Sequence, residues 1–303
     1  MRREGLRGPV SIIKATALEV LSEPLTLLVL LAALALAVLA PAFHYHQFGD
    51  PTRMARDAGF SALFTCGSIV AVFGTIRAFR REIESGTMEM ALAHPVSRTA
   101  FFLSKVGGAM LAYLLFAAVV FAVTLVTVEG AAIGGALAAK TGDVARMFGP
   151  CLAGGVAVLV APLVVAAALN RFARFRYVLS AIVLAFVLSV VAAGVAAAYA
   201  GGLILRLLPV AVLISAPTLV LLAAAASFAV RLKANAAASA VGVVFALTVP
   251  AIGNYYLVDA LSAGGAVSWG YVALAVAVAL PAVAAFLLAG VAFINGRDIL
   301  WTT

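Results

Sequence analysis

The stretch Ala100–Thr127, AFFLSKVGGAMLAYLLFAAVVFAVTLVT, decides the fold of this chain. It contains a single charged residue, Lys105, near its start, and every other residue is apolar, small or weakly polar. About 20 apolar residues in a helix that rises 1.5 Å per residue cross the roughly 30 Å of hydrocarbon in a bilayer. The stretch is therefore predicted to be a membrane-spanning helix.

Seven further stretches have the same character. Of the 303 residues, 65% are hydrophobic and 11% are charged, which excludes an ordinary soluble enzyme and a disordered chain. We expect an all-α, polytopic helical membrane protein in which residues 1–303 form one transmembrane domain. The eight predicted spans cover residues 25–43, 58–77, 100–127, 149–169, 178–198, 208–230, 237–257 and 270–293.

The turn inside residues 178–230 is very short, because only Gly201-Gly202 and Arg206 separate the two apolar stretches, with Pro209 just beyond. One of these two helices could be re-entrant instead of spanning. A re-entrant pair would bring the number of spans down to six.

The distribution of Lys and Arg predicts the orientation. Cytoplasmic loops carry an excess of basic residues. With the N-terminus inside, the inner side receives Arg2, Arg3, Arg7, Lys14, Arg77, Arg80, Arg81, Arg98, Lys105, Arg171, Arg174, Arg176, Arg231, Lys233 and Arg297. The outer side receives Arg53, Arg56, Lys140, Arg146 and Arg206. We therefore expect a multi-pass plasma-membrane protein with both termini in the cytoplasm, and the scattered basic residues argue against nucleic-acid binding.

Two segments imitate binding sites. Gly134–Thr141 nearly matches the phosphate-binding loop, but Ala139 stands where the second glycine is needed and no strand precedes it. His44-Tyr45-His46 offers two metal ligands without a third. We expect no catalytic residue, no cofactor and no metal, and any ATP hydrolysis would belong to a partner subunit.

Residues 9–22 are predicted to form an amphipathic helix. Val10, Ile13, Ala17 and Leu21 recur at helical spacing, and Ser22-Glu23-Pro24 then interrupts the helix before the first span. A helix of this kind before a first span is typical of one that lies in the cytoplasmic membrane interface.

The segment 79–96, between the second and third spans, is too polar to cross the bilayer. Acidic and apolar residues alternate along it, Gly86 permits a bend, and Pro95 ends a helix. A short charged helix joining two long spans would let a cytoplasmic partner tilt both of them. On composition alone, a solvated loop remains the alternative.

The string REIESGTMEMALAHPVSRTAFFLSK, Arg81–Lys105, resembles the pattern of permease subunits of the type-2 class of ATP-binding-cassette (ABC) transporters. In that class the pattern is roughly E-x-E-x-G-T-x-E-x-L-x-x-x-P-V-S-R, followed by a helix with a Lys near its start. The matching residues are Glu82, Glu84, Gly86, Thr87, Glu89, Leu92, Pro95, Val96, Ser97, Arg98 and Lys105. The resemblance reaches over roughly residues 9–128, and the family commonly has six spans.

The resemblance implies a cytoplasmic ABC ATPase as partner and a dimer with a second permease copy or homologue. Phe79–Ala93 would be the coupling helix that sits in a cleft of the ATPase. The residues expected to couple to the ATPase are Glu82, Glu84, Gly86, Thr87, Glu89, Pro95 and Arg98. Export is the usual direction of transport in the family.

Two other functions compete with an ATP-driven exporter. The same permease and ATPase could act as a mechanotransmitter on an outer-side partner instead of moving a solute. An ion-coupled carrier is disfavoured, because no Asp or Glu falls near the middle of a predicted span to hold the coupling ion.

Overall fold

A computed structural model describes residues 4–40, 51–86, 97–141, 149–174, 176–200, 203–252 and 267–296. These residues form helices joined by short connections, with no strand in the described ranges. The helices are α1 (Glu4–Ser22), α2 (Pro24–Leu39), α3 (Pro51–Glu84), α5 (Arg98–Thr141), α6 (Gly149–Ala173), α7 (Tyr177–Ala200), α8 (Leu203–Arg231), α9 (Ala234–Ile252) and α11 (Trp269–Asn295). The chain is therefore a helical membrane protein, as its composition predicts.

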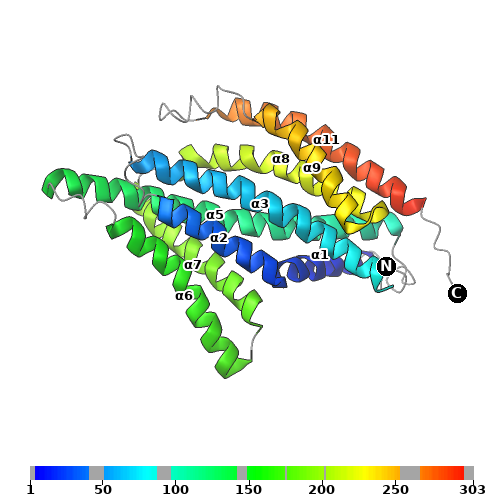
Figure 1. The fold of residues 1–303 in the computed structure, drawn as a ribbon, viewed down its shortest axis with the longest axis horizontal. Coiled ribbons are helices and arrows are strands. Elements are labelled where there is room, and N and C mark those ends of the chain that lie inside the picture. The colour runs from blue at the N-terminus through cyan, green and yellow to red at the C-terminus, as the bar shows by residue number, and fades with distance from the viewer. Residues whose placement is uncertain are drawn as a thin grey trace.

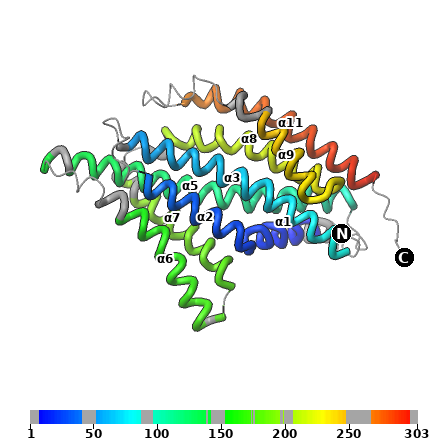
Figure 2. The backbone as a smooth tube through the Cα atoms, viewed as in Figure 1, coloured from blue at the N-terminus to red at the C-terminus, as the bar shows by residue number. Residues whose placement is uncertain are grey.

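The helices form an elongated bundle in which α3 and α5 run side by side (Figures 1 and 2). The end of α3, the start of α5 and the end of α11 lie at the same end of the bundle, on the right in Figure 1. The hairpin of α6 and α7 diverges from the other helices toward the bottom of the view. By the predicted orientation, the right-hand end is the cytoplasmic one.

Two helices are much longer than a bilayer requires. α3 has 34 residues and α5 has 44, so they extend about 51 and 66 Å at 1.5 Å per residue. Phe102, Tyr113 and Phe116 of α5 are buried in the core that these two helices share with their neighbours. The region around α3 and α5 is the structural centre of the molecule.

The number of spans differs from the eight that the sequence predicts. Six of the described helices are long and apolar enough to cross a membrane, and the bent pair of α1 and α2 would bring the number to seven. Both helices of the pair in doubt, α7 and α8, pass this test. The two that do not pass are α2, with 16 residues, and α9, whose described apolar part is Ala234–Ala246. Each is too short by itself, because about 20 residues are needed.

The chain bends by 63° between α1 and α2. Pro24 has no N–H, so the Val20 carbonyl loses the partner that a continuous helix would supply. The Thr26 hydroxyl donates to this carbonyl over 2.7 Å in its place. The interruption predicted at Ser22-Glu23-Pro24 is therefore present, and a buried side chain replaces the missing hydrogen bond.

Helix α1 packs closely against the first turns of α5. A Cβ added at Gly108 would lie 2.6 Å from the Ile13 carbonyl oxygen and 2.7 Å from the Thr16 Cβ. Small residues allow such close backbone approach between membrane helices. The glycine thus allows α1 to pack closely against the start of α5.

Candidate functional site

The first residues of the predicted coupling helix belong to α3. Residues 79–84 are not part of a separate short helix but the last turns of α3, which ends at Glu84. The helix continues because Ala78 and Phe79 are buried against the bundle, and because Arg80 pairs with Glu84 one turn later at 2.8 Å. No helix-breaking residue precedes Gly86.

The chain leaves α3 through a turn at Ser85 and Gly86. Ser85 N–H still donates to the Arg81 carbonyl over 3.0 Å, and Gly86 then has φ +69°. This left-handed conformation suits glycine and disfavours side chains with a Cβ. Three predicted coupling residues, Thr87, Glu89 and Pro95, fall within 87–96, outside the described residues.

A buried ion pair joins the end of α3 to the start of α5. Lys105 Nζ lies 2.9 Å from Glu82 Oε2, and the lysine side chain is only 1% exposed. The ammonium also donates to the Ala78 carbonyl and lies over the Phe79 ring, 5.3 Å from its centroid. Removing either partner of such a pair leaves a charge in a place with little water. Two residues of the family pattern, 23 positions apart, are therefore in direct contact.

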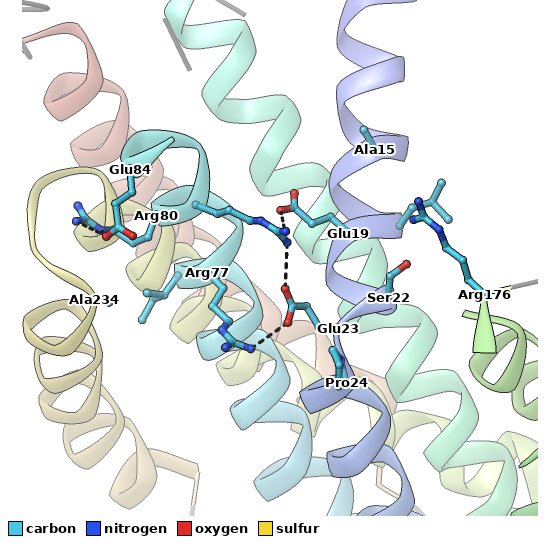
Figure 3. A pocket seen from close by; sticks show the side chains of 13 residues that line it. Ala15, Glu19, Ser22, Glu23, Pro24, Arg77, Arg80, Glu84, Arg176 and Ala234 are labelled. Carbon is cyan, nitrogen blue, oxygen red and sulfur yellow. Dashed lines mark hydrogen bonds and ion pairs between the residues drawn. The ribbon is translucent and has the colours of Figure 1, made fainter. Parts of the chain in front are cut away.

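A second set of ion pairs joins α3 to the junction of α1 and α2 (Figure 3). Arg77 Nη1 lies 2.9 Å from Glu23 Oε2, and Arg81 Nη1 lies 3.6 Å from Glu23 Oε1 and 3.8 Å from Glu19 Oε1. Burial raises the pKa of Glu19, and the nearby Lys105 ammonium lowers it again in part. The two arginines are exposed, so each pair contributes roughly 1 kcal/mol or less by itself.

Arg98 connects the start of α5 to the end of α11, since its Nη1 donates to the Asn295 carbonyl over 3.4 Å. This contact, the Glu82–Lys105 pair and the Glu84–Arg80 pair place the coupling residues that the structure describes. All of them lie at one end of the bundle, on either side of the segment 87–96, and this is the end that the charge distribution predicts to be cytoplasmic.

A cleft of about 840 Å³ lies beside these ion pairs. Its lining comes from α1, the start of α2, the end of α3, the connection before α7 and the start of α9. Figure 3 shows Arg80 and Glu84 on one side of it and Arg176 on the other. The cleft therefore brings together charged side chains of both signs from distant parts of the chain.

Sequence reasoning named the acidic residues after Phe79 but overlooked the roles of Glu19, Glu23, Arg77 and Arg81. A signal for them existed in the spacing. Arg77 and Arg81 are four residues apart, which places them on one face of a helix. An acidic residue next to Pro24, at a predicted helix break, was a candidate partner for that face.

The segment that imitates a phosphate-binding loop, Gly134–Thr141, belongs to the last turns of α5. In a helix the backbone N–H groups donate to carbonyls one turn earlier, so they cannot surround a phosphate. His44 and His46 fall outside the described residues. Within the described ranges, no three His, Cys, Asp or Glu side chains gather as a metal site would require.

The ion pairs at the end of α3 connect helices to one another and do not form a catalytic site within the described residues. Salt bridges tie the end of α3 to α5 on one side and to the α1–α2 junction on the other. The end of α3 is therefore connected by ion pairs to three neighbouring helices, α1, α2 and α5.

In a comparison with known families, the model of the ABC-2 family transporter protein matches residues 22–192, more than half of the chain. This region contains the end of α3, Lys105, all of α6 and most of α7. Comparisons with curated proteins and with solved structures give no match.

Proposed function

Because the chain belongs to the ABC-2 transporter family, we propose that it is the membrane permease subunit of an ATP-driven exporter, coupled to a separate cytoplasmic ATPase. The permease role and the membrane location follow from membership of the family. The direction of transport and the coupling to the ATPase are what we propose in addition. The permease pairs with a second copy or a homologue in the plasma membrane.

The observation that carries this proposal is the buried pair of Glu82 and Lys105. A lysine that is 1% exposed holds the last turn of α3 against α5, directly before the charged segment that resembles a coupling helix. Movement of that segment would reach α5 through this pair, and would reach α1 and α2 through Glu23. We infer that ATP-driven motion enters the bundle here.

The proposal needs this end of the bundle to face the cytoplasm. A reporter fused after Arg231 or at Thr303 is expected to be cytoplasmic, and a reporter near Lys140 or Asp259 is expected to be external, since the basic residues favour this orientation. Reporters such as alkaline phosphatase and green fluorescent protein measure this directly. A cytoplasmic Lys140 would reverse the orientation of α5 and contradict the proposal.

Coupling is tested by Glu84→Lys and Gly86→Val. Reversing the charge at Glu84, which is 63% exposed, places a cation where a carboxylate would accept charge-assisted hydrogen bonds from the ATPase. Valine at Gly86 cannot adopt φ +69° without strain. Each change is expected to weaken co-purification with the ATPase by about tenfold or more and to abolish transport-coupled hydrolysis.

The control is Asp143→Lys, a charge reversal in a predicted outer loop. It is expected to affect neither ATPase binding nor coupled hydrolysis. Yield and the far-ultraviolet circular dichroism of all three variants should match the wild type, because none of the changes lies in the hydrocarbon. If the Glu84 and Gly86 variants bind the ATPase and couple normally, the end of α3 is not the coupling site.

A further inference from the structure

Next to the charged cleft, one turn earlier along α3, lies an apolar groove. On α3, the cleft is lined by Ile76, Arg77 and Arg80, and the groove by Val72 and Phe73, one turn earlier. Residues three and four apart lie on the same face of a helix. The two cavities therefore occupy successive turns of one face of α3.

Helix α9 shows the same succession. Ala234, at its start, lines the cleft, whereas Ala238, Val241 and Gly242 line the groove. The groove has a volume of about 300 Å³ and is bounded by α3, α8 and α9. α3 and α9 pack against each other, so the same two helices lead from a polar cavity to an apolar one.

The polar cavity contains arginine donors suited to a phosphate. A guanidinium carries five N–H donors. Glu23 engages Nη1 of Arg77, and Glu84 engages Nε and Nη2 of Arg80. Each arginine thus keeps further N–H groups, and Arg77 is 58% exposed. Basic pockets between membrane helices on the cytoplasmic side are typical sites for lipid headgroups.

The groove has room that the protein does not fill. A Cβ added at Gly242 would have no atom within 4 Å. Phe73, which lines the groove, is 45% exposed. In a bilayer, an exposed aromatic residue beside such a groove would be available to lipid chains.

From the succession of the two cavities along α3 and α9, we propose that the cleft and the groove together bind one phospholipid of the cytoplasmic leaflet. Its headgroup phosphate binds Arg77 and Arg80, and one acyl chain lies in the groove between α3 and α9. A soluble phosphate compound would use only the cleft, and an apolar solute would use only the groove. A molecule with a charged head and an apolar chain uses both.

The proposal is independent of the coupling function, because binding is measured on the purified permease without an ATPase. Delipidated full-length protein in detergent is mixed with dioleoyl phosphatidylethanolamine or dioleoyl phosphatidylglycerol, and retained lipid is counted by native mass spectrometry. The double variant Arg77→Gln/Arg80→Gln is expected to bind about tenfold more weakly or worse, because charge-assisted hydrogen bonds are lost.

Gly242→Leu tests the groove. The side chain enters open space, so the fold is retained while the acyl chain is excluded, and phospholipid binding is expected to fall by a similar factor. Gly194→Leu is the matched control: Gly194 of α7 also has nothing near its Cβ position but lines neither cavity. It is expected to bind lipid like the wild type. Thermal unfolding of all variants checks that each is folded.

Four outcomes would overturn the proposal. If dioleoylglycerol binds as tightly as the phospholipid, the phosphate is not recognised. If glycerophosphoethanolamine binds as tightly as the phospholipid, the acyl chain is not recognised. Equal binding by the Gly242 and Gly194 variants would exclude the groove. If the arginine variant keeps its lipid but loses the ATPase, the cleft is a protein contact.

Discussion

Replacing Glu82 by leucine is expected to lower the free energy of unfolding by about 3–5 kcal/mol, because it leaves the buried Lys105 ammonium without its counter-ion. The lysine keeps the Ala78 carbonyl, the Phe79 ring and a weaker electrostatic interaction with Glu19. Lys105→Met is expected to cost less, since Glu82 is 29% exposed and water can reach part of it. Unfolding in mixed micelles, followed by circular dichroism, measures both.

The double variant Glu82→Leu/Lys105→Met separates a charge effect from a packing effect. Buried ion pairs are often replaced by apolar residues at little cost, so the double variant is expected to recover most of the stability that Glu82→Leu loses. The control is Asp57→Asn in the exposed pairs of Asp57 with Arg53 and Arg56, for which a change of about 1 kcal/mol or less is expected. Additive losses at Glu82 and Lys105 would show that the pair is not coupled.

Gly108→Leu is expected to detach α1 from α5 and to destabilise the bundle by about 3 kcal/mol or more, at the upper end of overpacking effects. The added Cβ would meet the Ile13 carbonyl oxygen at 2.6 Å and the Ala17 nitrogen at 3.2 Å. Backbone atoms of a helix cannot move aside as a flexible side chain can, so α1 must move as a whole.

Limited proteolysis reports this movement. Lys14 is exposed but lies within a helix, and trypsin is expected to cut there much faster once α1 is no longer held on α5. Gly194→Leu serves as the matched control, because nothing lies near that position. Unchanged proteolysis and stability in Gly108→Leu would mean that α1 and α5 are less closely packed than described.

Hydropathy predicted the fold class, and all eight apolar stretches contain helices. What it could not predict was where the helices end. The second span was placed at 58–77, but α3 extends over Pro51–Glu84. The extension depends on the burial of Phe79 and on the Arg80–Glu84 pair. Hydropathy measures neither tertiary burial nor ion pairing, so it cannot predict the extension.

The pattern from Arg81 to Lys105 identified the segment that contains the candidate site, but it did not predict which of its side chains are in contact. The contact between Glu82 and Lys105 depends on how α3 and α5 pack, and no local spacing rule predicts it. The ion pairs of Glu23 depend on the 63° bend at Pro24, which turns α1 across the end of α3. The sequence predicted the break but not its direction.

Insertion of the chain into the membrane follows an order that suits the Glu82–Lys105 pair. A lone lysine in an apolar helix is costly to place in the bilayer. Because α3 is synthesised before α5, Glu82 leaves the ribosome before Lys105 does. The two helices can then enter the membrane as a hairpin whose charge is neutralised at its base, so the nascent chain does not have to expose an unpaired lysine to lipid.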